Sequence, residues 1–152
     1  MRGPNGEELP QAVLFACTQN AVRSAMAEHI MRHLFGKVVY VDSAGARKGE
    51  RDDFVTEVMD EIGLSLGKHR PKSFDDMEEN SFDLVITLSP EAHHRAMELT
   101  RTSAAVVEYW PTHDPSAIEG SREQKLDAYR ECRDLLMQRI RARFAVNRAS
   151  DA

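Results

Sequence analysis

A cysteine and an arginine separated by five residues, Cys17 and Arg23, stand where an apolar run gives way to a helical pattern. The run over residues 13–16 has the composition of a short buried strand, and apolar residues recur at helical spacing after Ser24. In a loop between a strand and a helix, backbone N–H groups and the helix N-terminus favour negative charge. We therefore expect residues 18–23 to form an anion-binding loop with Cys17 at its base.

Such a loop favours the thiolate form of Cys17, which is the nucleophilic form of the side chain. Arg23 offers two parallel N–H donors, and these fit two oxygens of a phosphate-like anion. A nucleophile beside an oxyanion clamp predicts covalent attack on a tetrahedral oxyanion. The plainer alternatives are that Cys17 is a small buried hydrophobic residue and Arg23 a solvated helix residue. An arginine in the first turn opposes the helix dipole, however, and a bound anion would offset that cost.

The composition is that of one globular domain. The chain has 152 residues, of which 41% are hydrophobic and 30% charged, enough for a single core. A net charge of −5 argues against nucleic-acid binding, and no apolar run reaches the ~18 residues of a membrane span. Without an apolar signal segment, the expected location is cytoplasmic, with no membrane partner. We expect a flexible extension over residues 1–10, a single domain over 11–146 and a frayed tail over 147–152.

Strand and helix patterns alternate along the chain, which predicts parallel strands joined by helical crossovers. The expected strands lie at residues 11–16, 38–42, 83–88 and 104–108. The last expected helix runs from 121 to 144 and begins with a capping box formed by Ser121 and Gln124. This is an α/β fold, a four-stranded parallel sheet in a flavodoxin-like three-layer sandwich with helices on both faces. Ligands bind such sheets beyond the carboxyl ends of the strands. Cys17, Ser43, Ser89 and the segment before Asp114 all lie there.

The order of the motifs resembles that of a known enzyme family. A Cys-x5-Arg-Ser loop after a strand, Ser43-Ala44-Gly45 after the next strand and Asp114-Pro115 far downstream are similar to the low-molecular-weight protein tyrosine phosphatases. The thioredoxin-coupled arsenate reductases share that fold. The resemblance extends over residues 13–144, and it implies a hydrolase in which Cys17 forms a phosphocysteine intermediate. The phosphate would be held by the loop residues Thr18, Gln19, Asn20, Ala21, Val22 and Arg23.

The same resemblance implies roles for residues around the loop. Asp114 would be the general acid that protonates the leaving group, although Asp-Pro is also an ordinary turn signal. The Ser24 hydroxyl would stabilise the Cys17 thiolate, whereas from the residues alone Ser24 also fits a helix cap. Asn20 would hold the loop in shape through Ser43. The expected substrate is a phosphorylated protein or a small phosphomonoester.

Several positions depart from the phosphatase pattern. Gln19 replaces a glycine of the loop, Val22 replaces a frequent second cysteine, and no aromatic residue follows Asp114-Pro115, which leaves Tyr109 and Trp110 as the candidates for stacking. One alternative is an arsenate reductase that takes arsenate plus an external thiol reductant, since the region after the third strand lacks the relay cysteines. Another is a catalytically weak phosphate-binding module.

Neither the second cysteine nor the histidines are predicted to take part in the reaction. Cys17 and Cys132 are far apart, offer no zinc-binding spacing and are expected as free thiols, with Cys132 in the core. His29 and His33 are four residues apart on a helix, a spacing that can bind metal. Because no third ligand is evident, we interpret them as a solvated face and predict neither a metal nor a cofactor.

Overall fold

The computed structural model describes residues 9–67, 69–77 and 81–144. Strands and helices alternate as expected: β1 (Ala12–Cys17), α1 (Arg23–Phe35), β2 (Tyr40–Gly45), α2 (Asp53–Asp60), β3 (Leu84–Thr87), α3 (Pro90–Leu99), β4 (Val106–Tyr109) and α4 (Arg122–Phe144). Short 3-10 turns occur at Phe74–Asp76 and Pro115–Ala117. The predicted tail lies outside the described residues, as does most of the predicted N-terminal extension.

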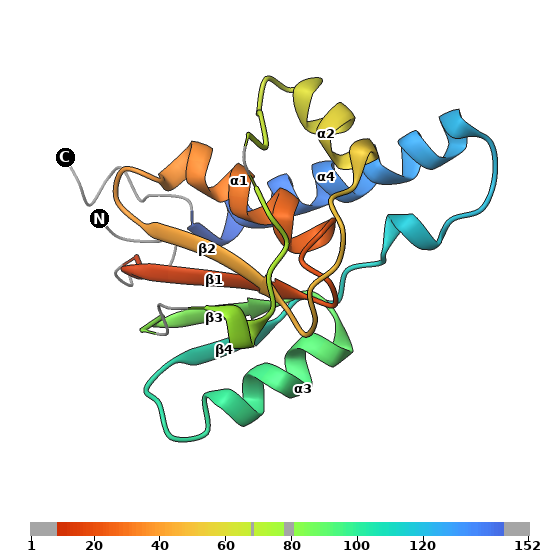
Figure 1. The fold of residues 1–152 in the computed structure, drawn as a ribbon. Coiled ribbons are helices and arrows are strands. Elements are labelled where there is room, and N and C mark those ends of the chain that lie inside the picture. The colour runs from red at the N-terminus through yellow and green to blue at the C-terminus, as the bar shows by residue number, and fades with distance from the viewer. Residues whose placement is uncertain (1–8, 68, 78–80, 145–152) are drawn as a thin grey trace.

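The four strands form one parallel sheet in the order β2-β1-β3-β4 (Figure 1). Helices α1 and α4 cover one face, with α2 beside α4, and α3 covers the other face. The predicted α/β class, the parallel sheet and the placement of helices on both faces are confirmed. Because β1 is a central strand, the loop that follows it lies in the middle of the carboxyl edge.

The central strand is apolar on both sides because both faces of the sheet are covered. Val13 and Phe15 are fully buried in the cluster with α1 and α4, whereas Leu14 packs in the smaller cluster under α3. Trp110 packs edge-on against Phe15, with ring centroids 6.3 Å apart. This packing fixes the strand whose last residue is Cys17.

The second strand begins later than its β-branched composition predicts. The backbone N–H groups of Val38 and Val39 both donate to the Phe35 carbonyl, at 3.0 and 2.9 Å, in the turn that closes α1. Val38 is 50% exposed, and pairing with β1 starts only at Tyr40. The prediction of a strand at 38–42 was therefore wrong at its start, because the end of α1 uses these backbone donors.

The last helix begins with the predicted capping box. The Ser121 N–H donates to Gln124 Oε1 at 2.8 Å, and the Gln124 N–H donates to Ser121 Oγ at 3.2 Å. A buried stripe along α4 then packs toward the sheet and α1: Leu126, Tyr129, Cys132, Leu136, Ile140 and Phe144. No helix in the described part of the chain has the length and apolar character needed to cross a membrane.

The Tyr129 hydroxyl connects α4 to the start of α2. It donates to Asp52 Oδ2 at 2.7 Å, and the other oxygen of Asp52 caps α2 by accepting from the Phe54 N–H.

A hydrogen bond to a charged group contributes about 1.5–3 kcal/mol. We expect Tyr129→Phe to lower the free energy of unfolding by about that amount in denaturant titrations. The control Tyr40→Phe, at a side chain that is 54% exposed, is expected to change it by less than about 0.5 kcal/mol. Equal effects of the two substitutions would contradict this account.

Candidate active site

The loop between β1 and α1 is shaped by Asn20. This is the one non-glycine residue with positive φ in the described part of the chain, at 59°, a conformation that asparagine tolerates better than most residues. Its fully buried side-chain amide donates to Ser24 Oγ at 2.9 Å and to Ser43 Oγ at 2.8 Å, and its Oδ1 accepts from the Lys72 N–H at 3.1 Å. The predicted support residues Asn20, Ser24 and Ser43 therefore lie together behind the loop.

A second segment holds the outer side of the same loop. The N–H groups of Ala46, Arg47 and Gly49 donate to the carbonyl oxygens of Cys17, Thr18 and Gln19, each at 2.9 Å. These carbonyls are therefore engaged by residues 46–49. In a trans peptide unit the N–H of the next residue points away from the carbonyl, so the N–H groups of residues 18–20 are directed away from residues 46–49. Phosphate binding by residues 18–23 stays a prediction.

The Cys17 side chain lies at the start of α1. Its Sγ is 2.9 Å from Ser24 Oγ and 3.4 Å from the Ser24 backbone nitrogen. Helix α1 begins without a side-chain cap, since its N-cap residue is Val22. Ser24 is therefore not the helix cap that the residues alone allowed, and its hydroxyl faces the sulfur instead.

Arg23 is 7% exposed and spans the gap to the segment before Asp114. Its guanidinium donates to the Thr112 carbonyl at 3.0 Å and to Thr18 Oγ1 at 3.4 Å, and lies 3.7 Å from Asp114 Oδ2. A solvated helix residue, the plainer alternative for Arg23, does not fit this burial. The guanidinium instead adjoins both the loop and a carboxylate.

Asp114 forms the turn that the Asp-Pro signal predicts, while its role as general acid stays a prediction. Its Oδ1 accepts from the Ser116 N–H and hydroxyl at 2.9 and 2.7 Å, which caps the turn at Pro115–Ala117. Its Oδ2 lies on the Arg23 side, and the side chain is 38% exposed. One carboxylate oxygen thus fixes the turn, and the other remains at the cavity.

These groups line one cavity of about 150 Å³, bordered by Cys17, Arg23, Asp114, Ser116, Arg47 and loop residues including Thr18 and Gln19. Asn20 and Ser43 do not line it. Arg47, which sequence reasoning did not assign to the site, reaches the mouth and pairs with Glu91 at 2.6 Å. Its position in a charged loop directly after β2 was the available signal.

The candidate stacking residues lie elsewhere. Tyr109 and Trp110 border a separate cavity with Arg139 and Arg143, and Trp110 turns toward Phe15 in the core. Among the residues that the structure describes, no aromatic side chain lines the Cys17 cavity. The suggestion that Tyr109 and Trp110 flank a substrate ring at this mouth was therefore wrong.

Cys132 is confirmed as a core residue. It is 6% exposed and borders a small cavity with His113 and Pro115, apart from the Cys17 cavity. Burial raises the pKa of its thiol to about 12. It is poorly placed to act as a second reactive thiol.

The histidines are arranged differently from the sequence interpretation. His33 is exposed, but the His29 ring packs edge-on against His69, with centroids 5.3 Å apart. The His69 Nε2 lies 3.1 Å from the Asn20 carbonyl, and burial lowers the pKa of His69.

Buried Glu28 accepts a hydrogen bond from the Ser43 hydroxyl. Sequence reasoning assigned no role to Glu28 or His69, and the only signal was an acidic residue within an apolar helix face.

The two thiols are expected to differ sharply in reactivity. At pH 8, a thiol with a pKa of about 12 is thiolate in only about one molecule in 10⁴, and Cys132 lies outside the Cys17 cavity. A disulfide reagent should therefore modify one thiol per native chain rapidly and a second only after denaturation. Cys17→Ser is expected to abolish the rapid phase. A rapid phase that persists in Cys17→Ser would contradict the assignment.

Gln19 fits into the loop because residue 49 has no side chain. A Cβ at Gly49 would lie 2.7 Å from Gln19 Cβ and 2.8 Å from Gln19 Oε1. We expect Gly49→Ala to lower the free energy of unfolding by about 1–3 kcal/mol, a typical cost of overpacking. In a Gln19→Gly background most of that cost should disappear, as measured by a double-mutant cycle in denaturant. Additive effects would show that the two side chains do not compete for this space.

Comparisons with known proteins agree with this geometry. The family model described as "Low molecular weight phosphotyrosine protein phosphatase" matches residues 12–149. An arsenate reductase from Bacillus licheniformis is 32% identical over 136 residues, which cover 89% of this chain and 95% of that protein. The tyrosine phosphatase Wzb from Escherichia coli K30, at 20% identity, has a TM-score of 0.72 and covers 88% of this chain and 95% of its own. An arsenate reductase in its oxidized state has the same TM-score at 21% identity, over 86% and 94% of the two chains. The chain belongs to the low molecular weight phosphotyrosine protein phosphatase family.

Proposed function

We propose that the protein is a phosphomonoesterase that works through a phosphocysteine intermediate. The observation that carries this proposal is the single cavity that joins the Cys17 sulfur, the Arg23 guanidinium and the Asp114 carboxylate. A nucleophile, an oxyanion clamp and a proton donor are the three groups that transfer of a phosphoryl group to sulfur requires.

In the first step, the Cys17 thiolate attacks phosphorus and the bond from phosphorus to the ester oxygen breaks. Arg23 and the N–H groups of residues 18–23 hold the other phosphate oxygens, where negative charge is spread in the transition state. Asp114, in its protonated form, gives a proton to the departing oxygen, so that the leaving group departs as an alcohol or phenol.

In the second step, water attacks the phosphocysteine and Asp114, now a carboxylate, takes one of its protons. The bond between phosphorus and sulfur breaks, and inorganic phosphate and the Cys17 thiolate result. The Ser24 hydroxyl, 2.9 Å from Sγ, is placed to donate to that thiolate as it leaves. The substrate is a phosphorylated protein or a small phosphomonoester. A cavity bordered by Arg47 and without aromatic side chains among its lining residues provides no ring-stacking preference for phosphotyrosine.

A second candidate function is arsenate reduction, because the curated relative from Bacillus licheniformis is named an arsenate reductase. Arsenate has the same tetrahedral shape and charge as phosphate, and Cys17 would displace one of its oxygens, as water, to form an arsenic–sulfur bond. The chain has only two cysteines, and Cys132 is buried outside the cavity. The two electrons would therefore come from external thiols, which end as a disulfide when arsenite is released.

Assays of aryl phosphate hydrolysis and of arsenate-dependent thiol oxidation on the same preparation separate these functions. We expect hydrolysis to dominate, Cys17→Ser to abolish it, and Asp114→Asn to lower kcat by about 100-fold or more because the proton donor is lost. The amide of Asp114→Asn keeps an oxygen that accepts from Ser116, so the turn is preserved.

Asp60→Asn, an exposed carboxylate on α2, is the matched control and should retain full activity. Hydrolysis that survives in Cys17→Ser would contradict the phosphocysteine mechanism. Thiol oxidation with negligible hydrolysis would favour the reductase. Tight phosphate binding without either activity would identify a phosphate-binding module instead.

A further inference from the structure

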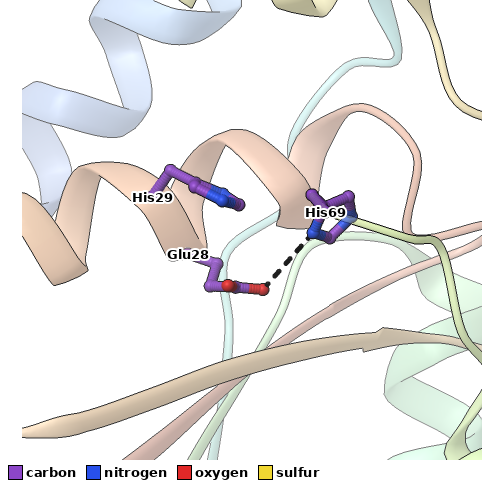
Figure 2. Close-up of side chains that lie close together, drawn as sticks. All are labelled: Glu28, His29 and His69. Atoms are coloured by element: carbon purple, nitrogen blue, oxygen red, sulfur yellow. Dashed lines mark ion pairs between the residues drawn. The ribbon is translucent and has the colours of Figure 1, made fainter. Parts of the chain in front are cut away.

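Three side chains with metal-ligating atoms converge outside the Cys17 cavity. Glu28 and His29 are neighbours on α1, and His69 comes from the segment after α2, so that the three groups are turned toward one another (Figure 2). One ligand atom from each lies within 4.8 Å of the other two. All three border a cavity of about 520 Å³ that shares no residue with the Cys17 cavity.

Both histidines have the tautomer that such a site requires. The His29 Nδ1 lies 2.8 Å from the Ala25 carbonyl, and the His69 Nε2 lies 3.1 Å from the Asn20 carbonyl. Because a carbonyl oxygen only accepts, these two nitrogens carry the ring hydrogens in the neutral rings. The lone pairs are therefore on His29 Nε2 and His69 Nδ1. Metal-bound histidines commonly donate their second ring nitrogen to a backbone carbonyl in this way.

The carboxylate of Glu28 is held in place by partners of its own. The residue is 4% exposed, its Oε2 pairs with Arg32 at 2.5 Å, and its Oε1 accepts from the Ser43 hydroxyl. That Oε1 is also the atom 3.8 Å from His69 Nδ1. An Oε1 with one hydrogen bond retains a lone pair for a cation.

We propose that Glu28, His29 and His69 bind a divalent transition metal ion of the zinc class. Two imidazoles and one carboxylate form a three-ligand set that Zn²⁺ accepts, and the cavity has room for water as the fourth ligand. Metal–ligand bonds of about 2.0–2.2 Å require the ligand atoms to lie roughly 3.4 Å apart. The ligand atoms now lie within 4.8 Å of one another, so binding requires them to approach by about 1.4 Å at most.

The basic side chains around the three ligands disfavour cations that are held mainly by charge. Arg32, Arg70 and Lys72 border the same cavity, although Arg32 pairs with Glu28 and Lys72 pairs with Asp42 at 2.6 Å. Ions held mainly by charge, such as Ca²⁺ and Mg²⁺, also prefer sets of oxygen ligands. Imidazole nitrogen is the ligand that favours zinc, cobalt and nickel here. An ion at this position would clamp His69, which contacts the anion loop through Asn20.

The experiment uses the Cys17→Ser chain, because the thiol in the Cys17 cavity would compete for soft metal ions. Calorimetric titration with Zn²⁺ is expected to give one ion per chain, and Co²⁺ should give the visible absorption of a tetrahedral complex. His29→Gln should lower the affinity for Zn²⁺ by about 100-fold or more, since even loss of a partner of a ligand costs 10–100-fold. His33→Gln, exposed on the same helix, is the matched control and should bind as the parent does.

Zn²⁺ is also expected to raise the Tm of the Cys17→Ser chain but not that of the chain carrying His29→Gln as well. Circular dichroism in the absence of metal checks that His29→Gln is folded. Should it fail to fold, ring-nitrogen NMR of the Cys17→Ser chain gives the same information, since Zn²⁺ should shift His29 Nε2 and His69 Nδ1. Unchanged affinity in His29→Gln, or shifts at other histidines only, would overturn the proposal.

Discussion

A hydrogen-bond chain of fixed direction connects the Glu28 carboxylate to the Cys17 sulfur. The carboxylate can only accept, so the Ser43 hydroxyl gives its one proton to Glu28 and must accept from the Asn20 amide. Asn20 Oδ1 is occupied by the Lys72 N–H, which leaves the amide nitrogen to donate to both Ser43 and Ser24. Ser24 therefore accepts from Asn20 and keeps its own proton, which it can donate to the Cys17 thiolate at 2.9 Å. The hydrogen bonds at the Cys17 sulfur therefore lead back to a buried carboxylate that lies outside the Cys17 cavity.

This chain operates only because the sheet brings distant segments to one edge. Cys17 ends β1, pairs with Gly45 at the end of β2, and is followed by the loop that residues 46–49 hold. A Cβ at Gly45 would lie 2.7 Å from the Gln19 carbonyl carbon and 2.8 Å from the Asn20 nitrogen, so the two loops approach more closely than any side chain allows. On the other side, Arg23 reaches the Thr112 carbonyl beyond β4. The anion loop is thus held between its two neighbouring segments.

Local pattern was sufficient for much of this architecture. Spacing alone predicted a loop after Cys17, where the structure has it between β1 and α1. Alternation of strands and helices predicted the parallel sheet. Both features depend on short-range periodicity. The contacts of Glu28 with Ser43 and of His69 with Asn20 join residues 15 and 49 positions apart. Contacts at such separations cannot be predicted from the local sequence pattern. The same limit led to the pairing of His29 with His33 at helical spacing, whereas the fold places His29 beside a residue from another element.

The positions of the two thiols favour one of the two reactions that could follow loading of Cys17. A cysteine loaded with a phosphoryl or arsenic group can be released by water or by another thiol. Cys132 borders a different cavity, and burial raises the pKa of its thiol, so the chain does not supply that second thiol at the loop. What it does supply there is Asp114, with one carboxylate oxygen fixed by Ser116 and the other beside Arg23. A carboxylate in that position can activate water but cannot reduce arsenic, and this asymmetry is the physical reason to rank hydrolysis first.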